Sequence, residues 1–428
     1  MGKTSIHRRS FLSKSAGAGT GLALAGFPGI IRARNVNNRL NLGIVGPGGR
    51  GTGRLKRFFE INQQFNARLI AVCDLWNYRR DKAVELVKEK QGQAPKAYRH
   101  HEELLADSEV DALIIATPDH AHAQILKLAA DAGKDVYCEK PMANVLEEAN
   151  AALDAVNKAG TIVQIGTQRR SSSKYRQAAK MIADGFIGDV IKVDLHWSAY
   201  SPYRWARKEK DISMAKESDL DWNTWLMGKS HRPFDPRIFR CFRLFKDFSS
   251  GIIDQWMSHG IDLAHMLTGV SYPLSAVTHG GIYQWKDYRE NPDTQEISLE
   301  YQKGDRKFLT VYSTNWINGY GSGTRVHGTL GSFSGESISD RETDWYFSGK
   351  GVKAKGKVGD RIPVSEAPGE TGHIANWLAA VRSRDSDRLY CPVAAGYGHS
   401  IACIMATDSY WSGKRMTFDP VKRTIQAG

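Results

Sequence analysis

Leu40-Asn41-Leu42-Gly43-Ile44-Val45 runs directly into Gly46-Pro47-Gly48-Gly49-Arg50-Gly51, and an apolar helical face follows over residues 52–65. This order predicts a buried strand, a glycine turn and a helix. In such a unit the first glycine of Gly-x-Gly-x-x-Gly permits the tight turn, the second lets a pyrophosphate approach the backbone, and the third lets helix and strand pack. The helix N-terminus offers N–H groups to the phosphates. The stretch therefore predicts a dinucleotide site at Gly46, Gly48, Gly49, Arg50 and Gly51.

Alternating strand and helix patterns continue on the C-terminal side of this turn. Apolar strands are predicted at 68–73, 112–116, 135–138 and 161–165, with helices at 121–132 and 147–159. Buried strands separated by helices indicate a Rossmann-type, doubly wound parallel sheet, here in an α/β domain spanning residues 37–168.

Residues 169–428 have a different pattern, and a chain of 428 residues is long enough for two domains. After a helix at 174–183, several strands alternate apolar and polar residues, as in an antiparallel sheet with one solvated face. This predicts an α+β domain with a largely antiparallel, open-faced sheet, for substrate binding and oligomerisation. The strands are expected at 190–196, 274–280, 296–301, 307–313 and 325–329, and helices at 373–381 and 399–411 are expected to close the chain.

The first 36 residues resemble an export signal. His7-Arg8-Arg9-Ser10-Phe11-Leu12 is similar to the twin-arginine motif, and a weakly apolar stretch follows over 16–31. The interpretation is export to the periplasm by the twin-arginine machinery, with membrane anchoring by an uncleaved signal left open. The alternative is a disordered basic N-terminus. Since nicotinamide dinucleotides are not expected to be plentiful outside the cytoplasm, an exported protein should hold one tightly.

The formal net charge of +13 does not indicate a nucleic-acid partner. Six uncompensated basic residues precede residue 35, and no basic-aromatic nucleic-acid module is visible in the rest. An anionic glycan or a membrane face stays open as a partner. Cys73 and Cys138 lie in apolar strands, so they are expected to be core residues rather than disulfide partners.

Polar residues follow the predicted strands at their carboxyl ends, where α/β folds hold ligands. Asp74 is expected to accept hydrogen bonds from the adenosine ribose, which favours NAD, although Arg79 and Arg80 leave NADP open. Thr117-Pro118-Asp119-His120-Ala121-His122 is expected to border the cofactor through Thr117, Pro118 and His122, while Asp119 either walls the site or caps the next helix. No third ligand is in register with the two histidines, so no metal site is predicted.

Glu139-Lys140-Pro141 ends the strand at 135–138 and places an amine at the same edge. Facing an oxidisable alcohol, Lys140 is a candidate general base. A useful base near neutrality needs a lysine pKa roughly 3 units below its ordinary value of about 10.4. Partial burial and a positive nicotinamide ring both act in that direction.

The order of these motifs, with His259-x-x-Asp262, resembles the glucose–fructose oxidoreductase/inositol dehydrogenase/MocA (Gfo/Idh/MocA) family, in an exported twin-arginine subgroup. The resemblance implies that Lys140 is catalytic, that the Glu139-Lys140-Pro141 turn and Gln168 lie beside the cofactor, that the proline is often cis, and that His259 and a carboxylate complete the site.

The chain departs from this family at the carboxylate. The family places it four residues before the histidine, one helical turn away, where this chain has Gln255. Asp254 is five residues before His259. We expect a local helical bulge to bring Asp254 round to the site; the alternative is that Gln255 takes the place and the acid is lost.

The function expected from the sequence is an exported NAD(P)-dependent oxidoreductase acting on a sugar, sugar derivative or polyol, with Lys140 as acid and base. The expected assembly is a homodimer or homotetramer. One alternative is an NAD-dependent glycosidase that oxidises its sugar transiently, eliminates the substituent and reduces the sugar back. Another is a non-catalytic sugar-binding protein on the same fold. Expected substrate-binding residues are Arg169, Trp197, Tyr203, Arg243 and His259.

Overall fold

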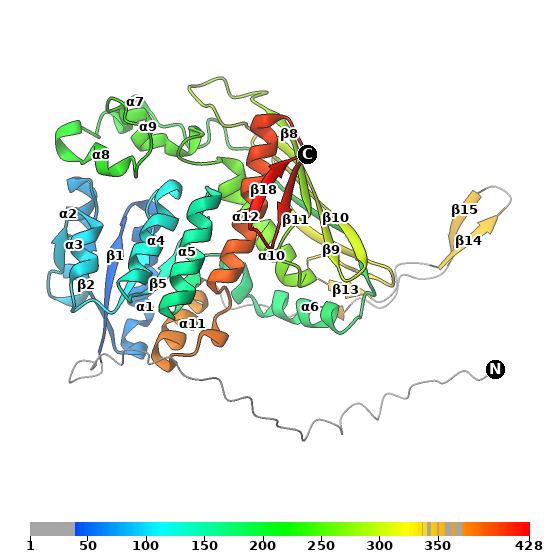
Figure 1. Ribbon diagram of the computed structural model, residues 1–428, viewed down its shortest axis with the longest axis horizontal. Helices are drawn as coiled ribbons and strands as arrows, with labels where there is room; N and C mark the ends of the chain where they lie inside the picture. The colour runs from blue at the N-terminus through cyan, green and yellow to red at the C-terminus, as the bar shows by residue number, and fades with distance from the viewer. Residues whose placement is uncertain (1–38, 336, 340–343, 349–350, 356–361, 364–369) are drawn as a thin grey trace, which may run out of the picture. The chain divides into compact units, whose positions relative to one another are not determined.

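The computed structural model describes residues 39–335, 337–339, 344–348, 351–355, 362–363 and 370–428 (Figure 1). The predicted export segment, residues 1–36, lies outside these described residues. Within them, no helix is both long enough and apolar enough to cross a membrane.

A six-stranded sheet forms the first part of the fold, with strand order β3-β2-β1-β4-β5-β6 and parallel pairing throughout. The order reverses between β1 and β4, as in a doubly wound sheet. This confirms the predicted Rossmann architecture. The strands are β1 (Leu40–Val45), β2 (Ala67–Cys73), β3 (Lys96–Tyr98), β4 (Ala112–Ile115), β5 (Asp135–Cys138) and β6 (Val163–Ile165). The helices are α1 (Gly49–Ile61), α2 (Asn77–Gln91), α3 (His101–Ala106), α4 (His122–Asp131) and α5 (Leu146–Ala159).

One helix from late in the chain packs on this first sheet. The predicted helix at 373–381 is α11 (Glu370–Ser383), and its Trp377 is fully buried among residues of β1 and α1. The indole Nε1 of Trp377 donates a hydrogen bond to the carbonyl of Ile162 (3.3 Å). A segment of the predicted second domain therefore contributes to the core of the first.

The second part of the fold is a ten-stranded sheet, in the order β16-β13-β12-β11-β7-β10-β9-β8-β17-β18. Only β7 and β10 pair in parallel, so the prediction of a largely antiparallel sheet is confirmed. The main strands are β7 (Val190–Ser198), β8 (Ser275–Gly281), β9 (Thr294–Lys303), β10 (Arg306–Asn315) and β11 (Gly321–Gly328). The short ones are β12 (Ser332–Phe333), β13 (Ser337–Ser339), β16 (Ile362–Pro363), β17 (Met416–Asp419) and β18 (Thr424–Ala427), and β14 (Asp344–Ser348) and β15 (Gly351–Lys355) form a separate hairpin.

Helices α6 (Ser173–Ala183), α10 (Ser258–Thr268) and α12 (Val393–Ser412) contribute to the same hydrophobic core as the second sheet. The prediction that helices close the chain was wrong, because β17 and β18 follow α12 and β17 pairs with β8. All five cysteines are buried and unpaired, which confirms the expectation for Cys73 and Cys138.

Residues 202–248 form a capping segment of short helices, including α7 (Glu209–Ile212), α8 (Trp222–Trp225) and α9 (Pro236–Cys241). These helices lie above the carboxyl ends of the Rossmann strands (Figure 1). An aromatic cluster that contains Trp76, Trp222 and Trp225 joins the capping segment to the end of β2.

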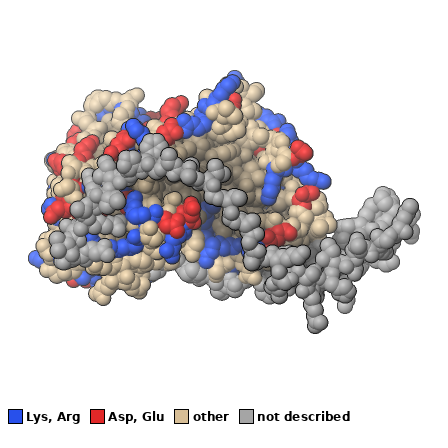
Figure 2. Space-filling model, turned by 60° about the horizontal axis from the view of Figure 1, so that its bottom comes forward, with Lys and Arg blue, Asp and Glu red and all other residues tan. Residues whose placement is uncertain are grey.

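Basic and acidic side chains lie side by side on the face that Figure 2 shows. Exposed ion pairs among the described residues include Arg57–Glu60 (3.0 Å) and Lys127–Asp131 (2.7 Å). Such pairs contribute little to stability, but they keep the local charge balanced.

Candidate active site

The glycine turn between β1 and α1 has the geometry that a dinucleotide needs. Gly46 has φ +78°, and a side chain there would meet the backbone N of Thr117 at 2.7 Å. A side chain at Gly51 would collide with the carbonyl oxygen of Gly46, whereas no atom lies within 4 Å of the position it would take at Gly48. The backbone at Gly48 is therefore open to a phosphate. The helix begins at Gly49, three residues before its predicted start, and no side chain caps its first N–H groups.

A cavity of about 270 Å³ opens beside this turn. The ends of β2, β4 and β5 and the capping segment all contribute side chains to its wall. The predicted cofactor residues that line it are Gly46, Gly48, Gly49, Arg50, Asp74, Thr117, Pro118, His122, Glu139 and Lys140. These predicted residues come from four segments that are far apart in the sequence, and the topology of the sheet brings the segments together.

One end of the cavity lies at Asp74, as expected for the adenosine half of a dinucleotide. Asp74 Oδ1 accepts a hydrogen bond from the backbone N of Trp76 (2.9 Å), and burial raises the pKa of this carboxyl to about 6. The guanidinium groups of Arg79 and Arg240 lie 5.6 and 4.8 Å from the Trp76 ring, and Phe239 meets that ring edge-on at 5.4 Å. Arg240 and Phe239 belong to the capping segment, so this end is roofed by it.

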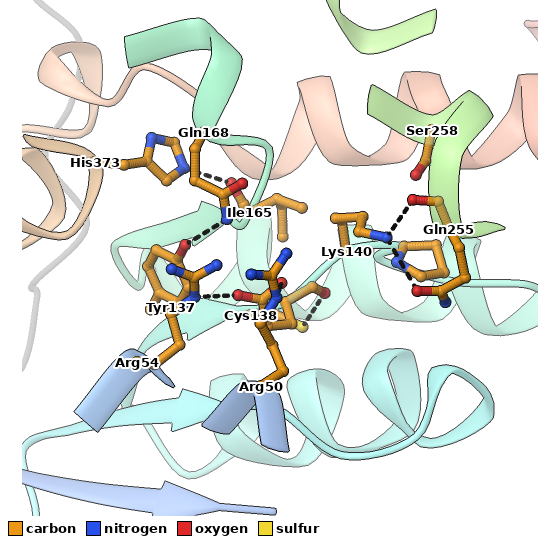
Figure 3. Close-up of polar contacts among 12 residues, drawn as sticks. Arg50, Arg54, Tyr137, Cys138, Lys140, Ile165, Gln168, Gln255, Ser258 and His373 are labelled. Carbon is orange, nitrogen blue, oxygen red and sulfur yellow. Dashed lines mark hydrogen bonds and ion pairs between the residues drawn. The ribbon is translucent and has the colours of Figure 1, made fainter. Parts of the chain in front are cut away.

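The other end of the cavity is built around Lys140, which is only 6% exposed. Its Nζ donates to the carbonyl oxygens of Gln255 (2.9 Å) and Asp254 (3.2 Å) and lies 3.4 Å from Gln255 Oε1 (Figure 3). A cis peptide bond joins Lys140 to Pro141. Both carbonyls belong to a π-helical turn, Ile253–Met257, which leads into α10.

Burial lowers the pKa of the Lys140 ammonium to about 8. The negative charges of Asp119 and Glu139 oppose this fall, and the positive charges of Arg243 and Arg50 reinforce it. The predicted fall in the pKa of Lys140 is therefore present in the folded chain before a positively charged nicotinamide ring is bound. An amine with this pKa exchanges a proton near neutrality.

Glu139 stabilises the turn that carries Lys140. The carboxylate forms an ion pair with Arg54 of α1 and lies 3.7 Å from Arg50 Nε. Burial acts to raise the pKa of Glu139, but the two arginines hold it below its ordinary value. Glu139 is thus a charged link between the end of β5 and the first turns of α1.

Asp119 lines the cavity, which is the first of the two roles expected for it from the sequence. Its Oδ2 accepts hydrogen bonds from Ser249 Oγ (2.6 Å) and Gln255 Nε2 (2.5 Å), and the side chain is 2% exposed. It makes no helix-capping bond. Because the Gln255 amide donates to Asp119, its oxygen faces Lys140, so the three side chains form one connected chain. In the sequence, the evidence for this role was that Asp119 follows the carboxyl end of a predicted strand.

The π-helical turn is the local bulge expected before His259, but it does not bring the Asp254 carboxylate to Lys140. Asp254 Oδ2 accepts instead from the backbone N of Ser250 (2.7 Å). Burial, together with repulsion from Asp119, raises the pKa of Asp254 to about 7. Gln255, rather than Asp254, lines the cavity.

His259 lies behind the cavity wall, next to a pair of tryptophans. Burial and the positive charges of Lys140 and Arg169 hold the pKa of His259 well below its ordinary value. Its ring is 6.1 Å from that of Trp197, which stacks on Trp256 at 5.1 Å. The imidazole is therefore uncharged near neutrality.

Two further predicted residues lie elsewhere. Gln168 is behind the Glu139 turn, where its Nε2 donates to the hydroxyl of Tyr137 (3.5 Å, Figure 3). Tyr203 is 55% exposed and packs against Trp285 at 5.1 Å. Neither residue lines the cavity, whereas the predicted substrate residue Arg243 does.

Comparisons with known proteins agree with this geometry. Residues 40–167 match the model of the GFO_IDH_MocA oxidoreductase family, described as an NAD-binding Rossmann fold. The first part of the chain therefore carries the NAD-binding fold of that oxidoreductase family, which supports the predicted resemblance and cofactor.

Two curated relatives are inositol dehydrogenases. The inositol 2-dehydrogenase/D-chiro-inositol 3-dehydrogenase of Lactiplantibacillus plantarum is 29% identical over 204 residues, 46% of this chain and 56% of the relative. The inositol 2-dehydrogenase of Salmonella paratyphi B is 30% identical over 195 residues, 45% and 56% of the two chains. The chain thus spans a little over half the length of the curated relatives it matches.

Among solved structures, the WlbA dehydrogenase of Bordetella pertussis, in complex with NADH and UDP-GlcNAcA, has the same fold. The TM-score is 0.63 at 18% identity, covering 89% of this chain and 99% of that one. This similarity extends over both parts of the molecule and concerns the fold alone.

Proposed function

We propose that the protein is an NAD-dependent oxidoreductase that acts on a hydroxyl group of a sugar or polyol, with Lys140 as acid and base. The observation that carries the proposal is the position of Lys140. Its buried amine, with a pKa near 8, shares one cavity with the open glycine turn. The inositol dehydrogenases among the relatives support an alcohol as substrate.

Different parts of the cavity wall would bind different parts of the dinucleotide. The amide groups at the start of α1 would hold the pyrophosphate, and Asp74 would hold the adenosine ribose. When bound, NAD would supply the hydride acceptor at its nicotinamide ring.

Lys140 is held so that one position on its nitrogen stays available. The carbonyls of Asp254 and Gln255 take two of its hydrogen-bonding positions, and the third has only the more distant Gln255 Oε1, at 3.4 Å. Uncharged, the amine would take the proton of a substrate hydroxyl there; charged, it would return it in the reverse direction. Asp119 keeps the Gln255 amide in the orientation that this arrangement requires.

The proposal includes export through the twin-arginine machinery, on the basis of residues 7–12 and the apolar stretch that follows them. The capping segment over the adenosine end is consistent with a dinucleotide that is retained after export. A homodimer or homotetramer is also proposed, with Leu309 and Val311 of β10 on the solvated face of the sheet as candidate contacts.

A cofactor that is retained after export would suit a second candidate, the NAD-dependent glycosidase. Such an enzyme would use the same site to oxidise a sugar, eliminate its substituent and reduce the ring again, with no exchange of cofactor. Lys140 would then act in both redox steps.

The experiment is to purify the exported protein, release its small molecules by denaturation and quantify NAD and NADP by mass spectrometry. The NAD-loaded protein is then mixed with a panel of polyols, sugars and glycosides, and the products are identified. We expect close to one NAD per chain, and either a ketosugar or released aglycone. Absence of a dinucleotide, with no NAD binding after addition, would rule the proposal out.

A further inference from the structure

One part of the cavity wall carries an unusual set of charges. Two arginines of the second domain line the cavity together with Lys140, and neither forms an ion pair with a described acidic residue. They are Arg207 and Arg243, and the positive charge of Arg204 also acts on Arg243. An inference from them rests on the proposed function, because it concerns the substrate of that same site.

Arg243 is the more constrained of the two. It lines the cavity with Lys140 and Gln255, and its Nε is buried with no hydrogen-bond partner. The guanidinium lies against apolar rings, 4.4 Å from Phe242 and 5.9 Å from Trp205. A guanidinium nitrogen that is buried without a partner is costly, so this half-buried side chain marks a place where an anion is expected to bind.

Burial lowers the pKa of Arg243, and the positive charges of Arg207, Arg50 and Arg204 lower it further. Asp119 acts in the opposite direction, but this carboxylate is already bonded to Ser249 and Gln255. The arginines therefore repel one another in a space where little negative charge is available.

Two further arginines lie over the stacked tryptophans and do not line the cavity. Arg169 is 5.0 Å from the Trp197 ring, and Arg204 is 5.5 Å from the Trp256 ring. Their positive charges act on His259 and on Arg243, respectively. Guanidinium groups of the cavity wall suit an oxyanion.

Several arginines of low exposure have an acidic partner. Arg170, adjacent to Arg169, bonds Asp262 at 2.8 Å. Further examples are Arg54 with Glu139 and Arg289 with Asp287. Exposed basic residues also have acidic neighbours on the face of Figure 2. In the cavity, by contrast, both Arg243 and Arg240 have a buried Nε without a hydrogen-bond partner.

The dinucleotide does not account for this charge. The start of α1 and Arg50 face its pyrophosphate position, and Arg79 and Arg240 flank the adenosine end. We propose that the substrate is an anionic carbohydrate, whose carboxylate, sulfate or phosphate group is bound by Arg243 together with Arg207.

The test uses the NAD-loaded full chain and isothermal titration calorimetry. The probes are the methyl glycosides of glucuronic, galacturonic and mannuronic acid, each paired with its uncharged methyl ester, and the 6-sulfates and 6-phosphates of the parent sugars, each paired with the parent. The charged member of at least one pair should bind about 10- to 100-fold more tightly, as expected for hydrogen bonds to a charged group. The pair with the largest ratio identifies the anion.

Arg243→Gln and Arg207→Gln, two residues that line the cavity, should each remove most of that preference while leaving NAD occupancy unchanged. The matched control is Arg325→Gln, which removes an exposed arginine of β11 and should have no effect. Equal affinities within every pair, no binding by any charged probe, or a preference that survives both cavity substitutions would overturn the inference. So would loss of NAD in Arg243→Gln, since the arginine would then serve the cofactor.

These outcomes are distinct from failure of the proposed function. A protein that oxidises neutral sugars with bound NAD, but shows no preference for anions, retains the function and refutes the anionic substrate. A protein that binds no dinucleotide refutes the function itself.

Discussion

The two ends of the cavity hold their ligands by different means. At the adenosine end, Arg79, Arg240 and Phe239 each contact the Trp76 ring. At the reaction end, Lys140, Gln255 and Asp119 form a connected chain in which each side chain orients the next. A single cation–π or ring contact contributes a small energy, whereas connected hydrogen bonds in a buried site depend on one another. Single substitutions should therefore have much larger effects at the reaction end.

The largest effect is expected from Lys140→Ala. Loss of the acid and base should slow reduction of bound NAD by about 10²- to 10⁴-fold, while NAD occupancy stays unchanged because the adenosine end is intact. Stopped-flow absorbance of the NAD-loaded protein at saturating substrate measures this rate. A variant within threefold of the wild-type protein would show that Lys140 is not the base.

The next effect is expected from Gln255→Glu. In the wild-type protein the oxidation rate should rise with pH through an apparent pKa near 8, since the amine is competent only when uncharged. A carboxylate 3–4 Å from Nζ stabilises the ammonium form and should raise this pKa by about one unit or more. The rate at pH 7 should then fall roughly tenfold. A pH profile of single-turnover rates that is the same in both proteins would contradict the coupling.

Asp119→Asn should shift the pH profile of the oxidation rate to lower pH, by a smaller amount than Gln255→Glu shifts it to higher pH. Asp119 favours the charged form of Lys140, so its neutralisation should lower the apparent pKa and raise the fraction of competent amine at pH 7. The asparagine oxygen still accepts from Ser249 or Gln255, which preserves the fold. The change should be less than one pKa unit, because Asp119 contacts Lys140 through Gln255. An upward shift is the contradictory result.

The smallest effect is expected at the adenosine end. Arg240→Ala should weaken NAD binding about 3- to 10-fold, equivalent to roughly 1 kcal/mol for one cation–π contact. Arg79→Ala should have a similar effect. Because both guanidinium groups contact the Trp76 ring and repel each other, the loss in the double variant should differ from the sum of the two energies. Fluorescence transfer from tryptophan to bound NADH measures these affinities. A loss in either single variant as large as that of the reaction-end variants would contradict the comparison.

Features that depend on local sequence patterns could be predicted from the sequence, and features that depend on long-range contacts could not. Glycine turns and continuous apolar strands are local patterns, so β1, α1 and the position of Lys140 were predicted closely. Helix α2 was not, because only Ala83 and Val87 of its residues are buried and the apolar face is short. The π-helical turn was predicted because the spacing before His259 departs from one helical turn.

The partners of Lys140 could not be predicted from local patterns. Asp119 and Gln255 are 136 positions apart in the sequence and meet only because the second domain packs on the ends of the first sheet. The capping segment likewise has short helices without periodicity, yet it closes the adenosine end. Long-range packing also explains β17, whose pairing partner β8 lies about 140 residues earlier.

The most direct test of the account follows the hydrogen that leaves the substrate. A sugar or polyol that the protein oxidises or cleaves is prepared with deuterium on the carbon that carries the reacting hydroxyl, and the protein-bound dinucleotide is analysed by mass spectrometry after one turnover or after a quench. The account predicts that deuterium appears in the nicotinamide ring in the wild-type protein, and about 10²- to 10⁴-fold more slowly in Lys140→Ala when both are quenched at the same times. Conversion of the substrate with no deuterium in the bound dinucleotide would contradict it.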